Sequence, residues 1–319
     1  MKIVSPIDHR DEAAALLAAG ADELYGGYPP AAWQARFGQL APINQRTFAE
    51  AQIASHADLT EIVQQAHDNG ASFSLTLNAP YYTASQLPLL LDYVDGAVTA
   101  GVDGIILADL GLLRQLSRRH PSVEFHASTL AHLLNSGAAA FYAQQGISRI
   151  VLPRHLTVAE MAEIIAENKA LRYDVFMLVG KCPNTEGLCT FHHSSPDKIW
   201  PCEIPYAMAA VAPPPSPTLR QAMQRQGSWS STNRRHGCGL CAIPGLLQMG
   251  IHGVKLVGRG APTAQKIQNL RLVQDFMVLA KSSLTPADYR RKAMAAHHQR
   301  FASPCSPNVC YYPEFYEAE

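Results

Sequence analysis

The stretch Gly104-Ile-Ile-Leu-Ala-Asp109 is one of eight short apolar runs that alternate with amphipathic helical segments along the 319-residue chain. This alternation is typical of parallel strands joined by crossover helices. The other predicted strands span residues 2–6, 23–28, 72–78, 123–127, 149–153, 174–180 and 253–258. Eight such units predict a (β/α)8 barrel of the TIM type. A doubly wound open sheet is the main alternative, but the sequence has no G-x-G-x-x-G or Walker phosphate loop.

Helix boundaries between the strands are marked by capping residues. Asp8 is placed to cap a first helix that Gly20 ends. Thr157 and Glu160 have the spacing of a capping box. A long helix is predicted over 263–281, directly after the eighth strand.

Two segments depart from the repeating pattern. The connection between the seventh and eighth strands is far longer than an ordinary βα loop and contains a proline-rich run at 212–217. We interpret residues 181–242 as a cysteine-rich insertion within a barrel domain that spans 1–282. Residues 283–319 then form a C-terminal helix and a cysteine-containing tail that is added to the barrel.

The equal numbers of positive and negative side chains exclude a strong electrostatic field over the whole protein. Lys plus Arg and Asp plus Glu number 26 each, which argues against nucleic acid or an anionic membrane surface as a partner. The first residues include Asp8, Arg10 and Asp11, where a signal peptide requires an apolar stretch. No later apolar run approaches the roughly 20 residues of a membrane span. We therefore expect a cytoplasmic location.

All seven cysteines lie in the second half of the chain, at Cys182, Cys189, Cys202, Cys238, Cys241, Cys305 and Cys310. In a reducing compartment, clustered cysteines are more often metal ligands than disulfides. Thiolates favour zinc or an iron–sulfur cluster over the oxygen-ligated cations. Cys182, Cys189 and Cys202 lack the tight pairs usual in structural zinc sites, which favours an iron–sulfur cluster and leaves zinc as the alternative.

Cys238-Gly-Leu-Cys241 is a CxxC pair with two candidate roles. It supplies the fourth ligand of the first site, or it joins Cys305 and Cys310 in a second, four-cysteine site of zinc or iron–sulfur type. A further alternative leaves Cys305 and Cys310 as free surface thiols.

Polar residues follow most of the predicted strands, and the active site of a TIM barrel lies at this carboxyl end. The candidates for catalysis are Tyr25, His126, Arg154, His155 and Arg259, and the candidates for substrate binding are Arg36, Asn78, Asp109 and Lys255. Arg154, Arg259 and Arg36 are predicted to hold a dicarboxylate or phosphate, because guanidinium groups bind these anions bidentately. His126 and His155 are suited to proton transfer near neutral pH. Asn78 and Asp109 have a structural alternative as turn or helix caps.

Several motifs occur in the order found in one known family. They are GADELYGG at 20–27, TLN at 76–78, ADLG at 108–111, HAST at 126–129, VLPR at 151–154, EGLC at 186–189, IPGLL at 243–247 and KLVGR at 255–259. Through these motifs the chain resembles, across nearly the whole barrel, the collagenase-like peptidase family U32. The later segments, 174–189 and 243–259, are the more diagnostic.

The resemblance implies a function that differs from the family's name. Its better-understood members are oxygen-independent hydroxylation proteins, which act in ubiquinone synthesis or on ribosomal or transfer RNA. They carry a 4Fe-4S cluster on four cysteines, and prephenate is implicated as their oxygen donor. By this resemblance Cys182, Cys189 and Cys202 match three cluster ligands, and Cys241 matches the fourth better than Cys238.

The chain departs from the family at His155 and Val257, where members often have glutamate. We therefore expect a different acceptor, small or lipid-like, hydroxylated with a carboxylated donor such as prephenate. One alternative is a U32-type peptidase. Another is a non-catalytic iron–sulfur or zinc subunit that works with a homologous or redox partner protein.

Overall fold

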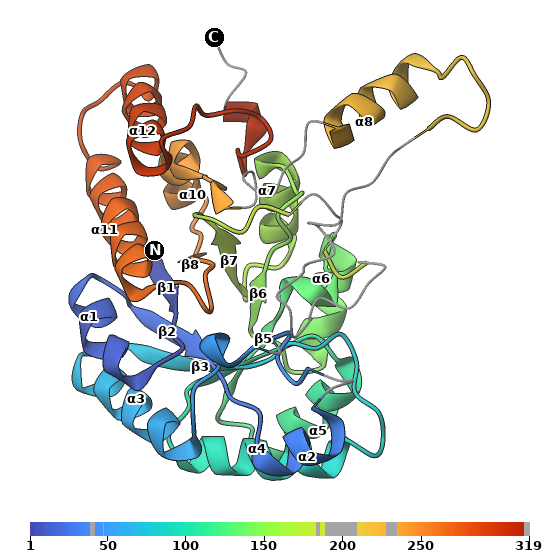
Figure 1. The fold of residues 1–319 in the computed structure, drawn as a ribbon, viewed down its shortest axis with the longest axis vertical. Coiled ribbons are helices and arrows are strands. Elements are labelled where there is room, and N and C mark those ends of the chain that lie inside the picture. The colour runs from blue at the N-terminus through green and yellow to red at the C-terminus, as the bar shows by residue number, and fades with distance from the viewer. Residues whose placement is uncertain (39–41, 47, 183–185, 189–208, 228–234, 316–319) are drawn as a thin grey trace.

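The computed structural model describes residues 1–38, 42–46, 48–182, 186–188, 209–227 and 235–315. Within these residues, eight parallel strands pair in chain order and close into a barrel (Figure 1). They are β1 Lys2–Pro6, β2 Glu23–Gly26, β3 Ser72–Leu77, β4 Gly104–Leu107, β5 Glu124–Ala127, β6 Arg149–Val151, β7 Arg172–Phe176 and β8 Gly253–Lys255. The predicted TIM-type barrel is confirmed, and each strand overlaps its predicted segment.

Six of the eight predicted strands run too far at their carboxyl ends, and β1 and β5 end where predicted. β4 ends at Leu107 rather than Asp109, because the Asp109 carboxylate caps the following helix and accepts a hydrogen bond from the Leu112 amide at 2.6 Å. β6 ends at Val151, and Pro153 beyond it has no N–H to donate to a neighbouring strand. These residues leave the sheet and form the rim above the barrel.

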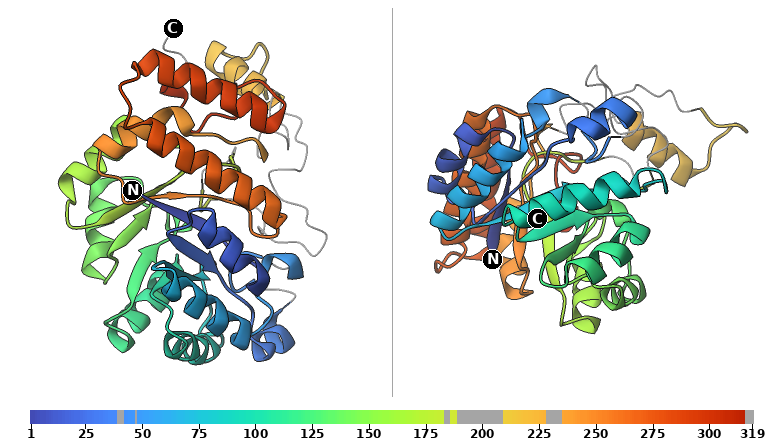
Figure 2. Two further views of the ribbon diagram at one scale, coloured as in Figure 1. Left: turned by 90° about the vertical axis from the view of Figure 1, so that its left-hand side faces the viewer. Right: turned by 90° about the horizontal axis from the view of Figure 1, so that it is seen from below.

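Helices surround the barrel on its outer face (Figures 1 and 2). They are α1 Ala13–Ala18, α2 Ala31–Phe37, α3 His56–Asp68, α4 Leu87–Thr99, α5 Leu110–Arg119, α6 Ser136–Gln144, α7 Val158–Glu167, α8 Pro217–Gly227, α10 Ile243–Gln248, α11 Thr263–Leu279 and α12 Pro286–Phe301. In α3, Leu59, Ile62, Val63 and Ala66 recur at helical spacing and are all buried. Such apolar stripes hold the helices on the strands. By contrast, α8 belongs to the insertion and projects away from the barrel (Figure 1).

The two helix-start predictions had different outcomes. Thr157 and Glu160 form the predicted capping box of α7. The prediction for Asp8 was wrong, since its carboxylate does not cap α1. It accepts instead from the Gly260 amide at 2.6 Å and from the Lys266 ammonium, and so ties the loop after β1 to the start of α11.

The strand registers stack the inward-facing side chains of the barrel in layers, as in other TIM barrels. From the amino end to the carboxyl end, the layers are Glu23 with Gly104, Arg149 and Gly253; Val4 with Ser74, His126 and Asp174; Tyr25 with Ile106, Val151 and Lys255; and Pro6 with Thr76, Ser128 and Phe176. Val4, Tyr25 and Ile106 form a separate apolar cluster within this stack. The side chains of these layers fill the barrel interior, so a substrate approaches from the carboxyl end of the strands.

The tail is joined to the end of the insertion and to β7. Cys238 forms an antiparallel bridge with Leu178 and a parallel bridge with Cys310. The Tyr312 hydroxyl donates to the Phe176 carbonyl at 2.8 Å. α12 packs on the short turn Leu240–Ala242. None of the described helices combines the length and apolarity that crossing a membrane requires.

Candidate active site

A buried ion network occupies the lower two layers of the barrel. Arg149 Nη1 lies 2.6 Å from Glu23 Oε2, and Arg149 Nε donates to Asp174 Oδ2 at 2.8 Å. The side chains of all three are at most 2% exposed. Burial alone would raise the pKa of Asp174, but Arg149 and His252 lower it below its usual value. This network closes the barrel base, and none of its three members was predicted as a site residue.

His126 lies in this interior rather than at the rim. It is 1% exposed, belongs to the layer of Ser74 and Asp174, and its Nε2 is 3.2 Å from Glu124 Oε1. Burial would raise the pKa of Glu124, but His126 and nearby arginines lower it to about 2. The structure thus places His126 two layers below Phe176, within the ion network.

Tyr25 and Lys255 form the polar part of the third layer. Lys255 Nζ stands 3.5 Å from the centroid of the Tyr25 ring, and has no hydrogen-bond partner among the described residues. Burial lowers the pKa of Lys255 to about 7 and raises the pKa of Tyr25 to about 12. The Tyr25 hydroxyl donates to the Leu256 carbonyl at 2.7 Å. At neutral pH the lysine therefore exchanges a proton readily, whereas the phenol stays protonated.

The titration of Lys255 predicts a pH-dependent stability. The pKa of Lys255 is about 7 in the folded protein and ordinarily 10.5. At pH values between these two, Lys255 keeps its proton in the unfolded chain but has lost it in the folded chain. Stability then rises with pH, at up to about 1.4 kcal/mol per pH unit. Lys255→Met should be more stable than the wild type, and its advantage should shrink from pH 7 to 10. Urea unfolding between pH 7 and 10 measures the difference in stability between Lys255→Met and the wild type. Replacement of the exposed Lys2, Lys2→Met, is the control. A stability difference that stays constant over this pH range would contradict the lowered pKa of Lys255.

Arg259 is the main cation above the layers. It is 8% exposed, its Nη1 donates to Thr76 Oγ1 at 3.2 Å, and its Nη2 donates to the Asn44 carbonyl at 2.6 Å. Both acceptors are neutral. Burial lowers the pKa of Arg259. The charges of Arg259, Arg46 and Arg154 each lower the pKa of the Tyr25 hydroxyl, and the Asp8 carboxylate acts on it in the opposite sense. Such a group of desolvated cations is suited to an anionic ligand.

Arg154 is already paired. Its guanidinium contacts the Glu186 carboxylate, and its amide donates to Glu186 Oε2 at 2.6 Å. Its Cζ lies 3.5 Å from the centroid of the Phe176 ring. Glu186 is 3% exposed, and sequence reasoning missed it as a site residue although it begins the diagnostic EGLC motif. The Glu186 carboxylate therefore reduces the capacity of Arg154 to bind a substrate anion.

Arg36 and Arg46 come from the long connection after β2. Arg36 lies on the exposed face of α2, with its guanidinium over Phe37 at 5.2 Å. Arg46, which the sequence did not single out, is half-buried and acts on Tyr25 together with Arg259. In the sequence, the one indication that Arg46 belongs to the site is its place in the same loop as Asn44. Only the folded structure shows which arginine of this connection points toward the barrel.

The remaining predicted residues lie on the rim. Asp109 uses one carboxylate oxygen to cap α5 and the other to accept from the Tyr82 amide at 2.9 Å, so the structure gives it the capping role. Asn78 Oδ1 is buried and has no partner among the described atoms. His155 is largely exposed, and partial desolvation of its ring together with nearby His132 lowers its pKa.

The described cysteines do not assemble the ligand set that the resemblance implies. Cys189 and Cys202 lie outside the described residues. Cys238 and Cys241 line a pocket with Cys305 and Cys310, and Cys182 is not among its lining residues. Among the residues that the structure describes, no three His, Cys, Asp or Glu side chains are spaced to hold a metal ion as they lie. The described residues thus do not fit a cluster shared by Cys182 and the CxxC pair.

Known proteins match most of the chain. The sequence pattern of peptidase family U32 covers residues 9–312. The tRNA hydroxylation protein P of Haemophilus influenzae is 25% identical over 59% of this chain and 38% of its own length. The 23S rRNA 5-hydroxycytidine C2501 synthase of Escherichia coli is 27% identical over 47% of this chain and 23% of its own length. A collagenase of Porphyromonas gingivalis is 25% identical over 51% of this chain and 35% of its own length.

These relatives overturn one prediction. The balanced charge argued against a nucleic-acid partner, yet relatives of this chain are named for tRNA and 23S rRNA. Net charge was a poor guide, because cations gathered at one mouth are not visible in a sum over the chain. The chain spans less than half the length of these relatives. The match over residues 9–312 and the barrel confirm the resemblance, and the chain belongs to peptidase family U32.

Proposed function

We propose that this chain takes part in the oxygen-independent hydroxylation of a nucleobase in RNA, with a carboxylated oxygen donor such as prephenate. The names of its relatives support the hydroxylation and the class of acceptor. The observation that carries the proposal is Arg259, a buried guanidinium whose hydrogen-bond acceptors in the described part of the chain are both neutral. The acidic group that acts on Arg259, Asp8, is already paired with Lys266. A buried guanidinium whose hydrogen bonds go to neutral groups is costly, and an anionic ligand relieves that cost.

The donor's carboxylate is the ligand that suits this position. Arg259 uses one N–H of each terminal nitrogen in the bonds to Thr76 and Asn44, and a guanidinium has five N–H donors. Arg46 adds a second charge to the same mouth. A carboxylate bound here lies above Tyr25 and the fourth layer of the barrel. The arginines therefore bind and orient the donor.

Lys255 is the group best suited to proton transfer. With a pKa of about 7 it is present in both protonation states near neutrality, which is the condition for efficient acid–base exchange. Tyr25, with a pKa of about 12, retains its proton and serves as a hydrogen-bond donor. His155 is exposed on the rim. In this proposal Lys255 takes the proton-transfer role that the sequence suggested for the histidines.

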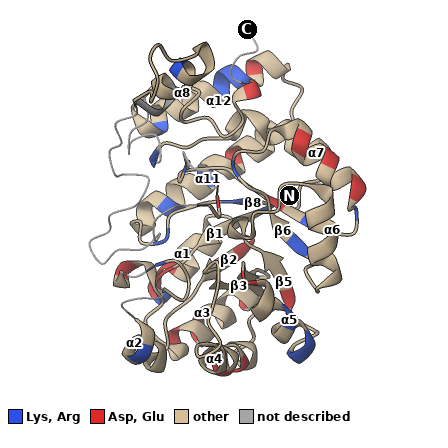
Figure 3. Ribbon diagram, turned by 90° about the vertical axis from the view of Figure 1, so that its right-hand side faces the viewer, with Lys and Arg blue, Asp and Glu red and all other residues tan. Residues whose placement is uncertain are grey.

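RNA binding depends on local cations. Lys and Arg are interspersed with Asp and Glu around the barrel helices (Figure 3). An RNA substrate would contact the mouth locally, because phosphate contacts by a few Lys and Arg residues suffice for weak, salt-dependent binding. Because such binding is weak, we propose that a partner protein adds further contacts to the RNA.

The iron–sulfur cluster stays a prediction, and of its expected ligands the structure describes Cys182, Cys238 and Cys241. A cluster would supply electron transfer to the hydroxylation. Because the described cysteines do not gather around Cys182, we derive no step through it. Iron and sulfide analysis of protein purified without oxygen tests this part separately.

The functional test compares RNA from the native host with and without the gene. We expect one hydroxylated nucleoside to disappear from tRNA or rRNA, by mass spectrometry of digested RNA, and to return when the gene is restored. Growth without oxygen should not abolish the modification in the wild type. Unchanged RNA together with loss of a hydroxylated small metabolite would overturn the RNA acceptor, and cleavage of unstructured peptides by the purified protein would favour a peptidase.

A further inference from the structure

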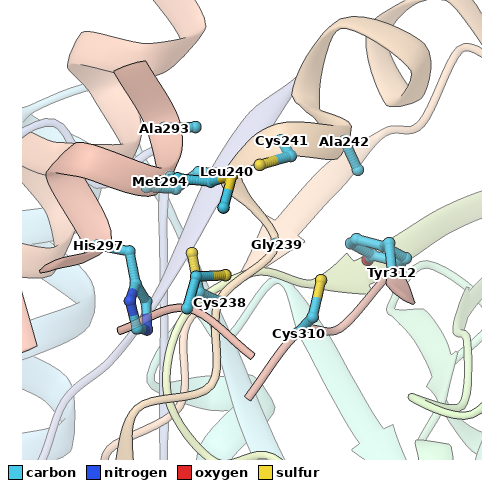
Figure 4. A pocket seen from close by; sticks show the side chains of 11 residues that line it. Cys238, Gly239, Leu240, Cys241, Ala242, Ala293, Met294, His297, Cys310 and Tyr312 are labelled. Atoms are coloured by element: carbon cyan, nitrogen blue, oxygen red, sulfur yellow. The ribbon is translucent and has the colours of Figure 1, made fainter. Parts of the chain in front are cut away.

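Four cysteines from two distant parts of the chain line one pocket. Cys238 and Cys241 come from the end of the insertion, and Cys305 and Cys310 come from the tail. Figure 4 shows the labelled sulfurs of Cys238, Cys241 and Cys310 around the same space, with the His297 ring on one side and the Tyr312 ring on the other. Cys238 and Cys310 are each 6% exposed. The hydroxylation site uses none of these four thiols.

The backbone fixes this arrangement. The Cys238 amide donates to the Val309 carbonyl at 2.9 Å, and the Tyr311 amide donates to the Cys238 carbonyl at 2.8 Å. These bonds pair the insertion and the tail like two adjacent strands, with Cys238 beside Cys310. Two segments more than sixty residues apart are thus held in the register that places their thiols together.

The tail separates these thiols from the barrel mouth. The Tyr311 ring lies on the mouth side, where it stacks over Phe176 with centroids 6.3 Å apart and faces Lys181 Nζ at 5.3 Å. The neighbouring Cys310 faces the opposite side, toward α12. Adjacent residues of an extended segment point to opposite sides. Cys182, next to Lys181, is accordingly absent from the pocket.

Backbone amides already point at the sulfurs. The Leu240 amide donates to the Cys238 sulfur, and the Tyr312 amide donates to the Cys310 sulfur, each from two residues further along the chain. The Ser306 amide donates to the Cys305 sulfur. Such bonds orient metal-bound thiolates and disperse their charge.

We propose that Cys238, Cys241, Cys305 and Cys310 bind one zinc ion, at a site distinct from any cluster at Cys182. Each coordinated thiol loses its proton to solvent, and no redox change is involved. The sulfurs as they lie are not at ligand spacing. In this proposal the side chains rotate about their Cα–Cβ bonds onto one ion, while the backbone holds the four residues around the pocket.

Zinc suits this pocket better than an iron–sulfur cluster. A single tetrahedral ion needs four donors and little room, and a fully thiolate-ligated zinc has no open position for chemistry. Apolar side chains, among them Leu240, Ala242 and Ala293, complete the lining. The ion would fasten the tail to the insertion and hold Tyr311 and Tyr312 against β7. Its role is therefore structural.

The test measures metal content in three proteins purified with reductant and without chelator. We expect about one zinc per chain in the wild type and in Cys182→Ser, and at least tenfold less in the double variant Cys305→Ser/Cys310→Ser. Removal of the zinc should lower the melting temperature of the wild type. Replacement by Co²⁺ should give the intense sulfur-to-cobalt charge-transfer bands of a tetrahedral thiolate site.

The cobalt spectrum of the wild type keeps the proposal testable if the double variant does not fold. The proposal would be overturned by wild-type protein with no zinc and no cobalt–thiolate bands, by equal zinc in the double variant, or by loss of zinc in Cys182→Ser. Disulfides among the four cysteines in place of zinc would also overturn it. If the wild type and Cys182→Ser contained iron instead of zinc, and the double variant lacked it, the four cysteines would bind a different metal from the one proposed.

Discussion

Arg149→Met is expected to destabilise the protein by about 3–5 kcal/mol. The substitution fills the same volume with an apolar chain but leaves Glu23 and Asp174 as buried carboxylates without their shared cation. Ser74 Oγ still donates to Glu23 Oε1 at 2.7 Å, which compensates only a small part of the charge. Urea unfolding followed by circular dichroism measures the loss.

The control for this change is Arg119→Met. Arg119 also pairs with a carboxylate, that of Asp95, but its side chain is 48% exposed, and exposed ion pairs contribute about 0–1 kcal/mol. Adding Glu23→Gln and Asp174→Asn to Arg149→Met should recover part of the loss, because none of the three side chains of this network then carries a charge. If Arg149→Met were as stable as Arg119→Met, the buried ion network would not contribute to the stability of the fold.

The fold was predictable because its signals are local. Eight apolar runs and intervening helices define a barrel without knowledge of any contact. The strand ends were less predictable, because a residue such as Asp109 directly follows the apolar run in sequence but caps α5 in space. Local pattern cannot decide between a last strand residue and a first rim residue.

The site was only partly predictable, because its contacts are long-range. Arg259 bonds to Asn44 across 215 residues, and Arg149 bonds to Glu23 across 126. Sequence position did locate Arg259 and Lys255 at the carboxyl end of β8. It did not distinguish Arg46 from Arg36, since both lie in one connection and only the folded structure leaves Arg36 exposed on α2.

The cysteines illustrate the same limit. Spacing left two candidate roles for the Cys238–Cys241 pair, and the register with Cys310 favours the second. Strand pairing between an insertion and a tail has no sequence signal of its own. The burial of His126 was hidden for a similar reason, since its depth in the barrel depends on the registers of all eight strands.

The largest functional effect is expected for Arg259→Gln, which should lower hydroxylation at least about 100-fold. Glutamine retains a hydrogen bond toward Thr76 or the Asn44 carbonyl but removes the charge that binds the donor. The variant is expressed in host cells that lack the native gene, and hydroxylated nucleosides are quantified in their RNA. Arg36→Gln, on the exposed face of α2, is the matched control and should retain activity.

Stability distinguishes a binding role of Arg259 from a structural one. A guanidinium that is 8% exposed and bonded to neutral acceptors costs folding energy, so its removal should leave the melting temperature unchanged or raise it. Prephenate should raise the melting temperature of the wild type and of Arg36→Gln but not of Arg259→Gln, since only a ligand that binds the folded state stabilises it. Loss of both stability and activity in Arg259→Gln would instead make Arg259 a structural residue, and the anion site would then have to rest on Arg46.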